Sequence, residues 1–169
     1  MHEIETPRTR LRPVRGSDLQ TLHRLWTHPD VRRYLWDDEV IPIELTASVI
    51  ERSEAQFAAQ RHGLWLAQEK PGDAIIGFCG FWYFRDPPEL ELLYGVDADH
   101  WGRGLATELA QAMLRHGFEA LGFERITGST DFPNLASARV MEKTGMRLDR
   151  RVLRDGKDTV FFVATKCED

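Results

Sequence analysis

Three short apolar runs follow one another in the middle of the chain, and they constrain the fold more than any other feature. The runs are "GLWLAQE", "AIIGFCGFWYF" and "ELELLYGV", and only "KPGD" and "RDPP" separate them. Short runs rich in aliphatic and aromatic residues are typical of buried β-strands, and separators containing glycine or proline are typical of turns. We therefore expect three consecutive antiparallel strands that pair as a meander.

Before these strands, the sequence predicts an edge strand and two helices. "RTRLRPVR" alternates Leu11 with basic residues, and Pro13 suits a sheet edge because proline lacks an amide hydrogen. Ser17 and Asp18 precede apolar residues at helical spacing, so we expect them to cap a first helix. "HPDVRRYLWDDEVIP" is interpreted as an irregular connection, and a second helix is expected from Ile43 to about Gln60.

After the strands, apolar residues at helical spacing predict an amphipathic helix from Leu105 that ends before Gly122. "ERITGST" predicts a strand, and "FPNLASARVMEKTGM" a helix capped by Asn134 and terminated by Gly145. "RLDRRVLRDGKDTVFFVATK" predicts a hairpin turning at Asp155–Gly156. The predicted order is β-α-α-β-β-β-α-β-α-β-β, which indicates a single α+β domain over residues 1–169 with a mixed sheet.

Length, charge and cysteine usage narrow the function classes. A chain of 169 residues suits one domain, and 22 basic against 27 acidic residues give a net charge of −5, which argues against a nucleic-acid partner. Cys79, Cys167 and the six histidines lack metal-ligand spacing, so neither a disulfide framework nor a metal site is expected. No signal peptide and no run of roughly 20 apolar residues is visible, which favours a cytoplasmic protein without a membrane partner.

The stretch "DHWGRGLATELAQ" places Gly102 and Gly104 at the start of the predicted third helix. Free amides at a helix N-terminus and the helix dipole favour an anion, and glycines let successive amides wrap phosphate oxygens. The stretch predicts phosphate recognition by backbone, and a flexible turn without a ligand is the alternative. A Walker loop would need Gly-Lys-Ser/Thr, and a dinucleotide fingerprint would need Gly or Ala where Thr107 stands.

"WGRGLATEL" resembles the Gly-rich loop of the GNAT superfamily of N-acetyltransferases, Arg/Gln-x-x-Gly-x-Gly/Ala, with Trp101, Gly104 and Ala106 in the first, fourth and sixth places. Tryptophan in the first place departs from that pattern but is common in the RimJ/RimL-type branch. "TPRTRLRP", "HPDVRRYL" and "NLASARVMEKTGM" resemble further segments of the same branch, in order. The resemblance implies a GNAT-like fold with a splayed central sheet and direct acetyl transfer from acetyl-CoA to an amine.

The resemblance also implies how the cofactor is held. Amides of the loop would bind the pyrophosphate, the strand ending at Val96 would pair with the pantetheine arm, and the Val96 amide would donate to the thioester carbonyl. Asn134 matches a pantetheine-contacting asparagine, although helix capping alone explains it as well. The implied cofactor-binding residues are Tyr94, Val96, Trp101, Gly102, Arg103, Gly104, Leu105, Ala106, Thr107, Asn134, Ser137 and Arg139.

Two residues are implied for the chemistry. Glu91 stands where the branch has Glu-x-Gly-Tyr and this chain has "ELLY", so it is the expected base for the acceptor amine, with Glu89 as a weaker substitute. Ser137 is expected to assist the leaving thiolate, because Met141 stands where many relatives have a tyrosine. A solvated strand carboxylate and a helix-surface serine are the alternatives for these two residues.

The acceptor is the least specified part of the sequence. A protein N-terminus and small amines such as polyamines, amino acids or aminoglycosides stay open, as does a homodimer. Asp37, Asp38 and Glu39 form either an acidic lip of the acceptor groove or a solvated loop. Trp65, Trp82 and Phe84 either line that groove or fill the core. A non-catalytic CoA-binding module and a nicotinamide oxidoreductase remain alternative function classes.

Overall fold

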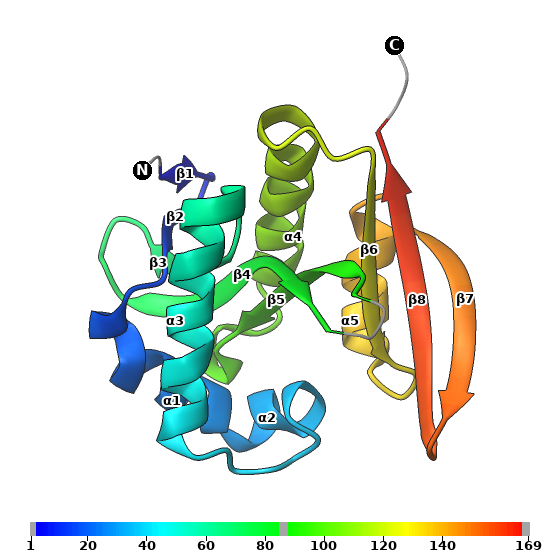
Figure 1. Cartoon of the computed structure of the whole chain (residues 1–169), viewed down its shortest axis with the longest axis horizontal. Coiled ribbons are helices and arrows are strands. Elements are labelled where there is room, and N and C mark those ends of the chain that lie inside the picture. Colours follow the sequence, from blue (N-terminus) through cyan, green and yellow to red (C-terminus); the bar gives the residue numbers. More distant parts are fainter. Residues whose placement is uncertain (1–2, 85–87, 167–169) are drawn as a thin grey trace.

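A mixed sheet of eight strands, in the order β1-β2-β3-β4-β5-β6-β8-β7, is the centre of the computed structural model, which describes residues 3–84 and 88–166 (Figure 1). The strands are β1 (Ile4–Glu5), β2 (Thr9–Pro13), β3 (Leu64–Glu69), β4 (Ile75–Tyr83), β5 (Leu90–Val96), β6 (Arg125–Asp131), β7 (Arg147–Arg154) and β8 (Lys157–Thr165). The α-helices are α1 (Leu19–Thr27), α2 (Pro29–Leu35), α3 (Ile43–Gln60), α4 (Leu105–Arg115) and α5 (Leu135–Lys143). Two short 3-10 helices, η1 (Gly16–Asp18) and η2 (Ala98–His100), and one π-helix, η3 (His116–Ala120), accompany them.

The predicted meander is confirmed, because β3, β4 and β5 pair antiparallel in succession. The C-terminal hairpin is confirmed too: Asp155 and Gly156 both have left-handed backbone, at φ 52° and 77°, as a two-residue turn between twisted strands requires. β5 and β6 make the one parallel pairing of the described sheet, and α4 carries the chain between them. The expected α+β class with a mixed sheet is therefore confirmed.

Two apolar clusters fill the two faces of the sheet. Leu109 of α4 and Met141 of α5 belong to the first cluster, with Leu92 of β5. Trp26 of α1 and Leu93 of β5 belong to the second, with α3 packed over it. Neighbouring residues of β5 thus point to opposite faces, and each buried leucine or methionine contributes about 1.5–3 kcal/mol to folding.

Two short elements correct the sequence expectations. β1 pairs with β2, with Ile4 opposite Leu11, so the strand at residues 9–13 is not the sheet edge; Pro13 lies beyond this pairing. Residues 29–35, expected as part of an irregular connection, form α2, which has proline at its first position and a hydrogen bond from Asp30 N–H to His28 Nδ1 (3.3 Å).

Asp18 precedes α1 as predicted, but its carboxylate does not cap that helix. It accepts hydrogen bonds from the Arg15 amide at 2.8 Å and from Arg12, whose two terminal nitrogens lie 2.8 and 2.9 Å away. Burial alone would raise the pKa of Asp18, but the bonds from Arg12 and Arg15 hold it below its ordinary value. Asp18 therefore ties the start of α1 to β2.

Candidate active site

The sheet opens between β5 and β6. These parallel strands share one pair of facing residues, Glu91 and Thr127, and Thr127 Oγ1 donates to the Leu90 carbonyl at 2.9 Å. Beyond this pair the two strands part, and Figure 1 shows β6, β8 and β7 standing apart from the strands of the meander. The splayed central sheet that the resemblance implied is confirmed.

The backbone of the β5 end faces this gap. The opposite edge of β5 pairs with β4: the Asp97 amide donates to the Ile76 carbonyl at 2.8 Å, and Val96 stands opposite Gly77. Because hydrogen-bonding groups alternate in direction along an antiparallel pair, the backbone groups of Val96 and Tyr94 point away from β4 and into the gap. An extended, amide-containing ligand can pair with them as a strand would.

The loop after β5 is open in front of its glycines. Gly102 and Gly104 both have φ 74°, a left-handed conformation that other residues rarely adopt. A Cβ on Gly102 would meet no atom within 4 Å, and one on Gly104 would meet Arg8 Nη2 at 3.7 Å. Trp101 Nε1 donates to the Val96 carbonyl at 2.8 Å and so fixes the loop to the end of β5. Backbone conformation requires these glycines, and the space before them is free.

The first turn of α4 adds further amides to this loop. Gly104 occupies the N-cap position, and its carbonyl accepts the Glu108 amide at 3.1 Å. The amides of Leu105, Ala106 and Thr107 have no intrahelical acceptor at these positions, and the helix dipole places partial positive charge there. The Leu105 side chain is buried in the core, so the turn is rigidly anchored. The residues from Trp101 to Thr107, which we call the anion cradle, thus present free amides that could hold an anion such as a diphosphate.

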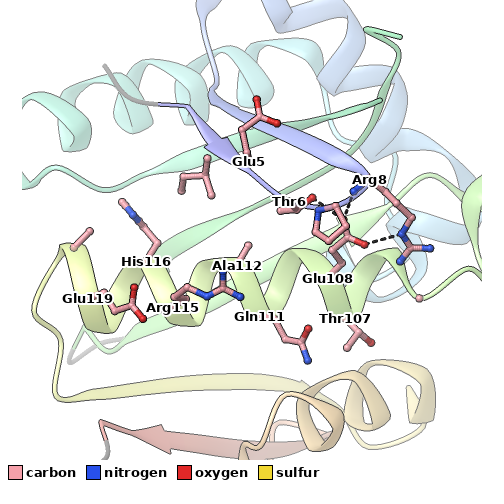
Figure 2. Close-up of a pocket in the computed structure, with 14 residues that line it drawn as sticks. Glu5, Thr6, Arg8, Thr107, Glu108, Gln111, Ala112, Arg115, His116 and Glu119 are labelled. Carbon is pink, nitrogen blue, oxygen red and sulfur yellow. Dashed lines mark hydrogen bonds and ion pairs between the residues drawn. The ribbon is translucent and has the colours of Figure 1, made fainter. Parts of the chain in front are cut away.

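The carboxylate of Glu108 connects the first turn of α4 to the N-terminal segment (Figure 2). Glu108 accepts hydrogen bonds from Thr6 Oγ1 at 2.6 Å, from the Arg8 amide at 2.8 Å and from Arg8 Nε at 2.7 Å. Arg8 Nη1 also donates to the Arg103 carbonyl at 2.6 Å. Burial alone would raise the pKa of Glu108, but the bonds from Thr6 and Arg8 hold it below its ordinary value. The N-terminal segment therefore fixes both the loop and the helix that follows it.

The two arginines expected near the phosphates are placed differently. Arg103 Nη2 donates to Glu69 Oε1 at 2.6 Å, and His100 Nε2 lies 3.5 Å from the other oxygen of that carboxylate. The hydrogen bond from Arg103 lowers the pKa of Glu69. Arg103 would have to share its charge between Glu69 and a phosphate. Arg139 is exposed on α5.

The structure brings Tyr94, Asn134 and Ser137 together on the α5 side of the gap. Tyr94 Oη lies 2.9 Å from both the carbonyl and the hydroxyl of Ser137. Burial raises the pKa of Tyr94 to about 12, so the phenol stays protonated at neutral pH. Asn134 Oδ1 accepts the Ser137 amide at 3.4 Å, which is the predicted helix cap. The phenol of Tyr94 was missed from the sequence, where only its backbone was expected to act.

Glu91 lies on the opposite face of β5 from Tyr94. Its side chain is 1% exposed, and Ser129 Oγ donates to its Oε2 at 2.5 Å. Glu89, two residues earlier in the chain, lies 2.9 Å from Arg150 and 3.5 Å from Arg125, so that weaker substitute is engaged in ion pairs. Sequence reasoning missed Ser129, although the alternation of polar residues in "ITGSTD" is a signal for a polar strand face.

A groove of the described structure does not coincide with the gap. It has a volume of about 430 Å³ and runs along α4 beside the β1–β2 segment (Figure 2). It touches the cradle at Gly104 and Thr107, and no residue of β5 or β6 lines it. A smaller pocket of about 50 Å³ lies on the Glu91 face, lined by side chains from α1, α2, α3, β3, β4 and β5. Trp82 and Phe84 line this pocket, whereas Trp65 packs into the α4-side core.

The acidic lip is largely neutralised within the chain. Asp37 forms an ion pair with Lys157 of β8, and Asp38 lies 3.0 Å from Arg32 Nε.

Among residues 3–84 and 88–166, no helix is long and apolar enough to cross a membrane. The same residues contain no cluster of three or more His, Cys, Asp or Glu side chains that could hold a metal. Cys167 lies outside the described residues.

Comparisons with known proteins agree with this geometry. The family described as "Acetyltransferase (GNAT) domain" matches residues 8–147. The uncharacterized N-acetyltransferase YoaA of Bacillus subtilis is 28% identical over 145 residues, covering 85% of this chain and 82% of that protein. Spermidine N(1)-acetyltransferase of Escherichia coli K12 is 23% identical over 152 residues, covering 86% and 76%. The solved structure of the RimL alpha-N-protein acetyltransferase with coenzyme A has a TM-score of 0.80 at 17% identity, covering 97% of this chain and 98% of that one.

Proposed function

The chain belongs to the GNAT acetyltransferase family, and from that premise we propose that it transfers acetyl directly from acetyl-CoA to a primary amine, on a protein N-terminus or a small molecule. The observation that carries the proposal is the gap between β5 and β6, which opens beside the anion cradle at residues 101–107. The family makes the chain an acetyl-CoA-dependent acyltransferase. Neither the non-catalytic module nor the nicotinamide oxidoreductase is supported by the comparisons.

The residues around the gap suit the parts of acetyl-CoA. When bound, the cosubstrate supplies an activated acetyl thioester. The amides from Gly102 to Thr107 would hold its diphosphate, and the backbone of Tyr94 and Val96 would pair with its pantetheine arm. The Val96 amide would donate to the thioester oxygen, where negative charge develops. Because Asn134 Oδ1 already caps α5, a contact from Asn134 would come from its amide nitrogen.

The acceptor must lose a proton before it can attack, because an amine is protonated at neutral pH. Glu91 is buried beneath Ser129, whose hydroxyl donates to it. We therefore infer that the acceptor donates a proton to Ser129 Oγ while Ser129 passes its own proton to Glu91. This arrangement gives Glu91 the role of general base through one hydroxyl.

The leaving sulfur would receive a hydrogen bond from Ser137. Tyr94 contacts that hydroxyl at 2.9 Å, so we assign Tyr94 as a positioning residue for Ser137. A thiol pKa of about 8.5 lets the thiolate leave without a strong acid. Ser137 is thus expected to assist the departure rather than to determine it.

Free thiol release from acetyl-CoA in the presence of an amine panel tests the proposal. The panel contains peptides that begin with alanine, serine, methionine or valine, together with spermidine and simple alkylamines. We expect amine-dependent release and an acetylated product of the matching mass. Release no faster than hydrolysis with every amine, by a protein that binds coenzyme A, would refute direct transfer to an amine.

A further inference from the structure

The pocket on the Glu91 face has a mainly apolar lining. Its volume is about 50 Å³, several times the 10–15 Å³ that a cavity needs to hold one water molecule, so it can hold a compact group of a few non-hydrogen atoms. Every side chain that lines it is aliphatic or aromatic. Trp26 forms its buried end, and Phe84, which is 48% exposed, lies at its rim. The pocket is therefore shaped for a compact apolar group that enters from solvent.

This pocket lies beside the proposed acceptor site. Trp82 lines it and stands directly opposite Glu91 in the β4–β5 pairing, so the two side chains share a face about 5 Å apart at Cβ. Leu93 also lines it and follows Glu91 by two residues on the same face. A group attached one or two carbons from an amine at Ser129 and Glu91 would fall among these side chains.

The charges around the pocket disfavour a second ammonium group. Arg52 already stacks on the Trp82 ring, 4.9 Å from its centroid. The buried indole nitrogens of Trp26 and Trp36, which have no hydrogen-bond partner among the described residues, can only donate. No carboxylate lines the pocket, and Asp37 and Asp38 are paired with cations of the chain. The pocket lining therefore offers no carboxylate to pair with a second ammonium group.

We propose that this pocket binds the side group of the acceptor, and that the acceptor is a monoamine carrying a compact apolar group of a few carbons near its nitrogen. An N-terminal valine or leucine and a branched alkylamine both have this chemistry. The inference rests on the proposed acetyl transfer, and it adds the substrate class of that site.

A pair of amines with the same shape and different charge tests the pocket. In 3,3-dimethylbutylamine a tert-butyl group stands where (2-aminoethyl)trimethylammonium carries a trimethylammonium group, and ethylamine lacks both. Rates are compared as kcat/KM for thiol release, expressed per free-base amine. We expect 3,3-dimethylbutylamine to exceed each of the others by at least about tenfold, since one methylene in a hydrophobic pocket changes kcat/KM about 10- to 200-fold.

Each other result overturns the inference. A preference for the trimethylammonium amine, or equal rates for this isosteric pair, would show that the pocket accepts a cation. A rate for ethylamine equal to that of 3,3-dimethylbutylamine would show that the pocket is not a subsite. No acetylation of any amine, including the peptides, would remove acetyl transfer itself and the inference with it.

A pocket-filling variant gives an independent test. Val49→Phe places a ring in the pocket from α3, and it should cut the preference for 3,3-dimethylbutylamine over ethylamine to within about twofold. Leu45→Phe, one turn earlier on α3 and outside the lining, is the matched control and should keep the preference. If Val49→Phe does not fold, Phe84→Ala at the rim should reduce the preference at least about threefold. An unchanged preference in the folded variants overturns the proposal.

Discussion

Replacing Tyr94 with phenylalanine removes one oxygen atom and its contacts with the carbonyl and hydroxyl of Ser137, each 2.9 Å long. A hydrogen bond contributes a net 0.5–1.5 kcal/mol, so losing two costs about 2 kcal/mol of unfolding free energy. For a domain of this size, that lowers Tm by roughly 4–8 °C. Thermal unfolding of both proteins at pH 8, followed by circular dichroism, measures the loss.

The pH dependence of this loss is a second readout. Burial raises the pKa of Tyr94 from 10.0 to about 12, and two pKa units correspond to about 3 kcal/mol. Because the folded-state pKa is the higher one, the contribution is complete below pH 10 and is lost as pH rises toward about 12. The stability difference between wild type and Tyr94→Phe should be constant from about pH 7 to 9 and shrink between about pH 10 and 12.

Activity distinguishes a positioning role from a purely structural one. We expect kcat to fall roughly tenfold in Tyr94→Phe, about 1.4 kcal/mol, with the KM for acetyl-CoA unchanged. The kcat of Ser137→Ala should fall by a similar factor. The kcat of the double variant should be only a little lower, because both changes remove the same oriented hydroxyl. Fully additive losses, or a Tyr94→Phe protein with wild-type stability, would refute the reasoning.

Two further predictions concern the carboxylates. Glu91→Gln should lower kcat at least about tenfold, with acetyl-CoA affinity unchanged by calorimetry; a wild-type kcat would exclude Glu91 from the mechanism. Asp18→Asn should cost about 2 kcal/mol in urea unfolding at pH 7. Because the folded-state pKa of Asp18 is lowered, its contribution to the unfolding free energy of the wild type is lost as pH falls below about 3.9. The unfolding free energies of wild type and Asp18→Asn should therefore converge at acidic pH.

Local sequence patterns predicted most of the elements, because their signals lie within a few residues. The meander, the bounds of α3 and the turn at Asp155–Gly156 are in this class. β1 escaped prediction because two residues cannot show an alternation. α2 escaped because its seven residues have no buried apolar stripe, although Pro29 at the first position was a usable signal.

The site could be predicted only in part, because its decisive contacts join distant segments. The cradle at residues 101–107 is one continuous stretch, so its glycines and helix start are visible in the sequence. The contact of Glu91 with Ser129 spans 38 residues, and that of Tyr94 with Ser137 spans 43. Both depend on how β5 and β6 align and then diverge, and local periodicity does not encode that register.

The central claim is that the cradle grips the diphosphate of coenzyme A, and calorimetric titration of coenzyme A into two isosteric variants tests it most directly. Asn and Asp both tolerate the left-handed φ of 74° at residue 104, so Gly104→Asn and Gly104→Asp differ only in charge. We predict that wild type and Gly104→Asn bind with affinities within about threefold, whereas Gly104→Asp binds at least about tenfold more weakly, because its carboxylate faces the phosphates. Equal affinities of the two variants, or no binding by wild type, would contradict the account.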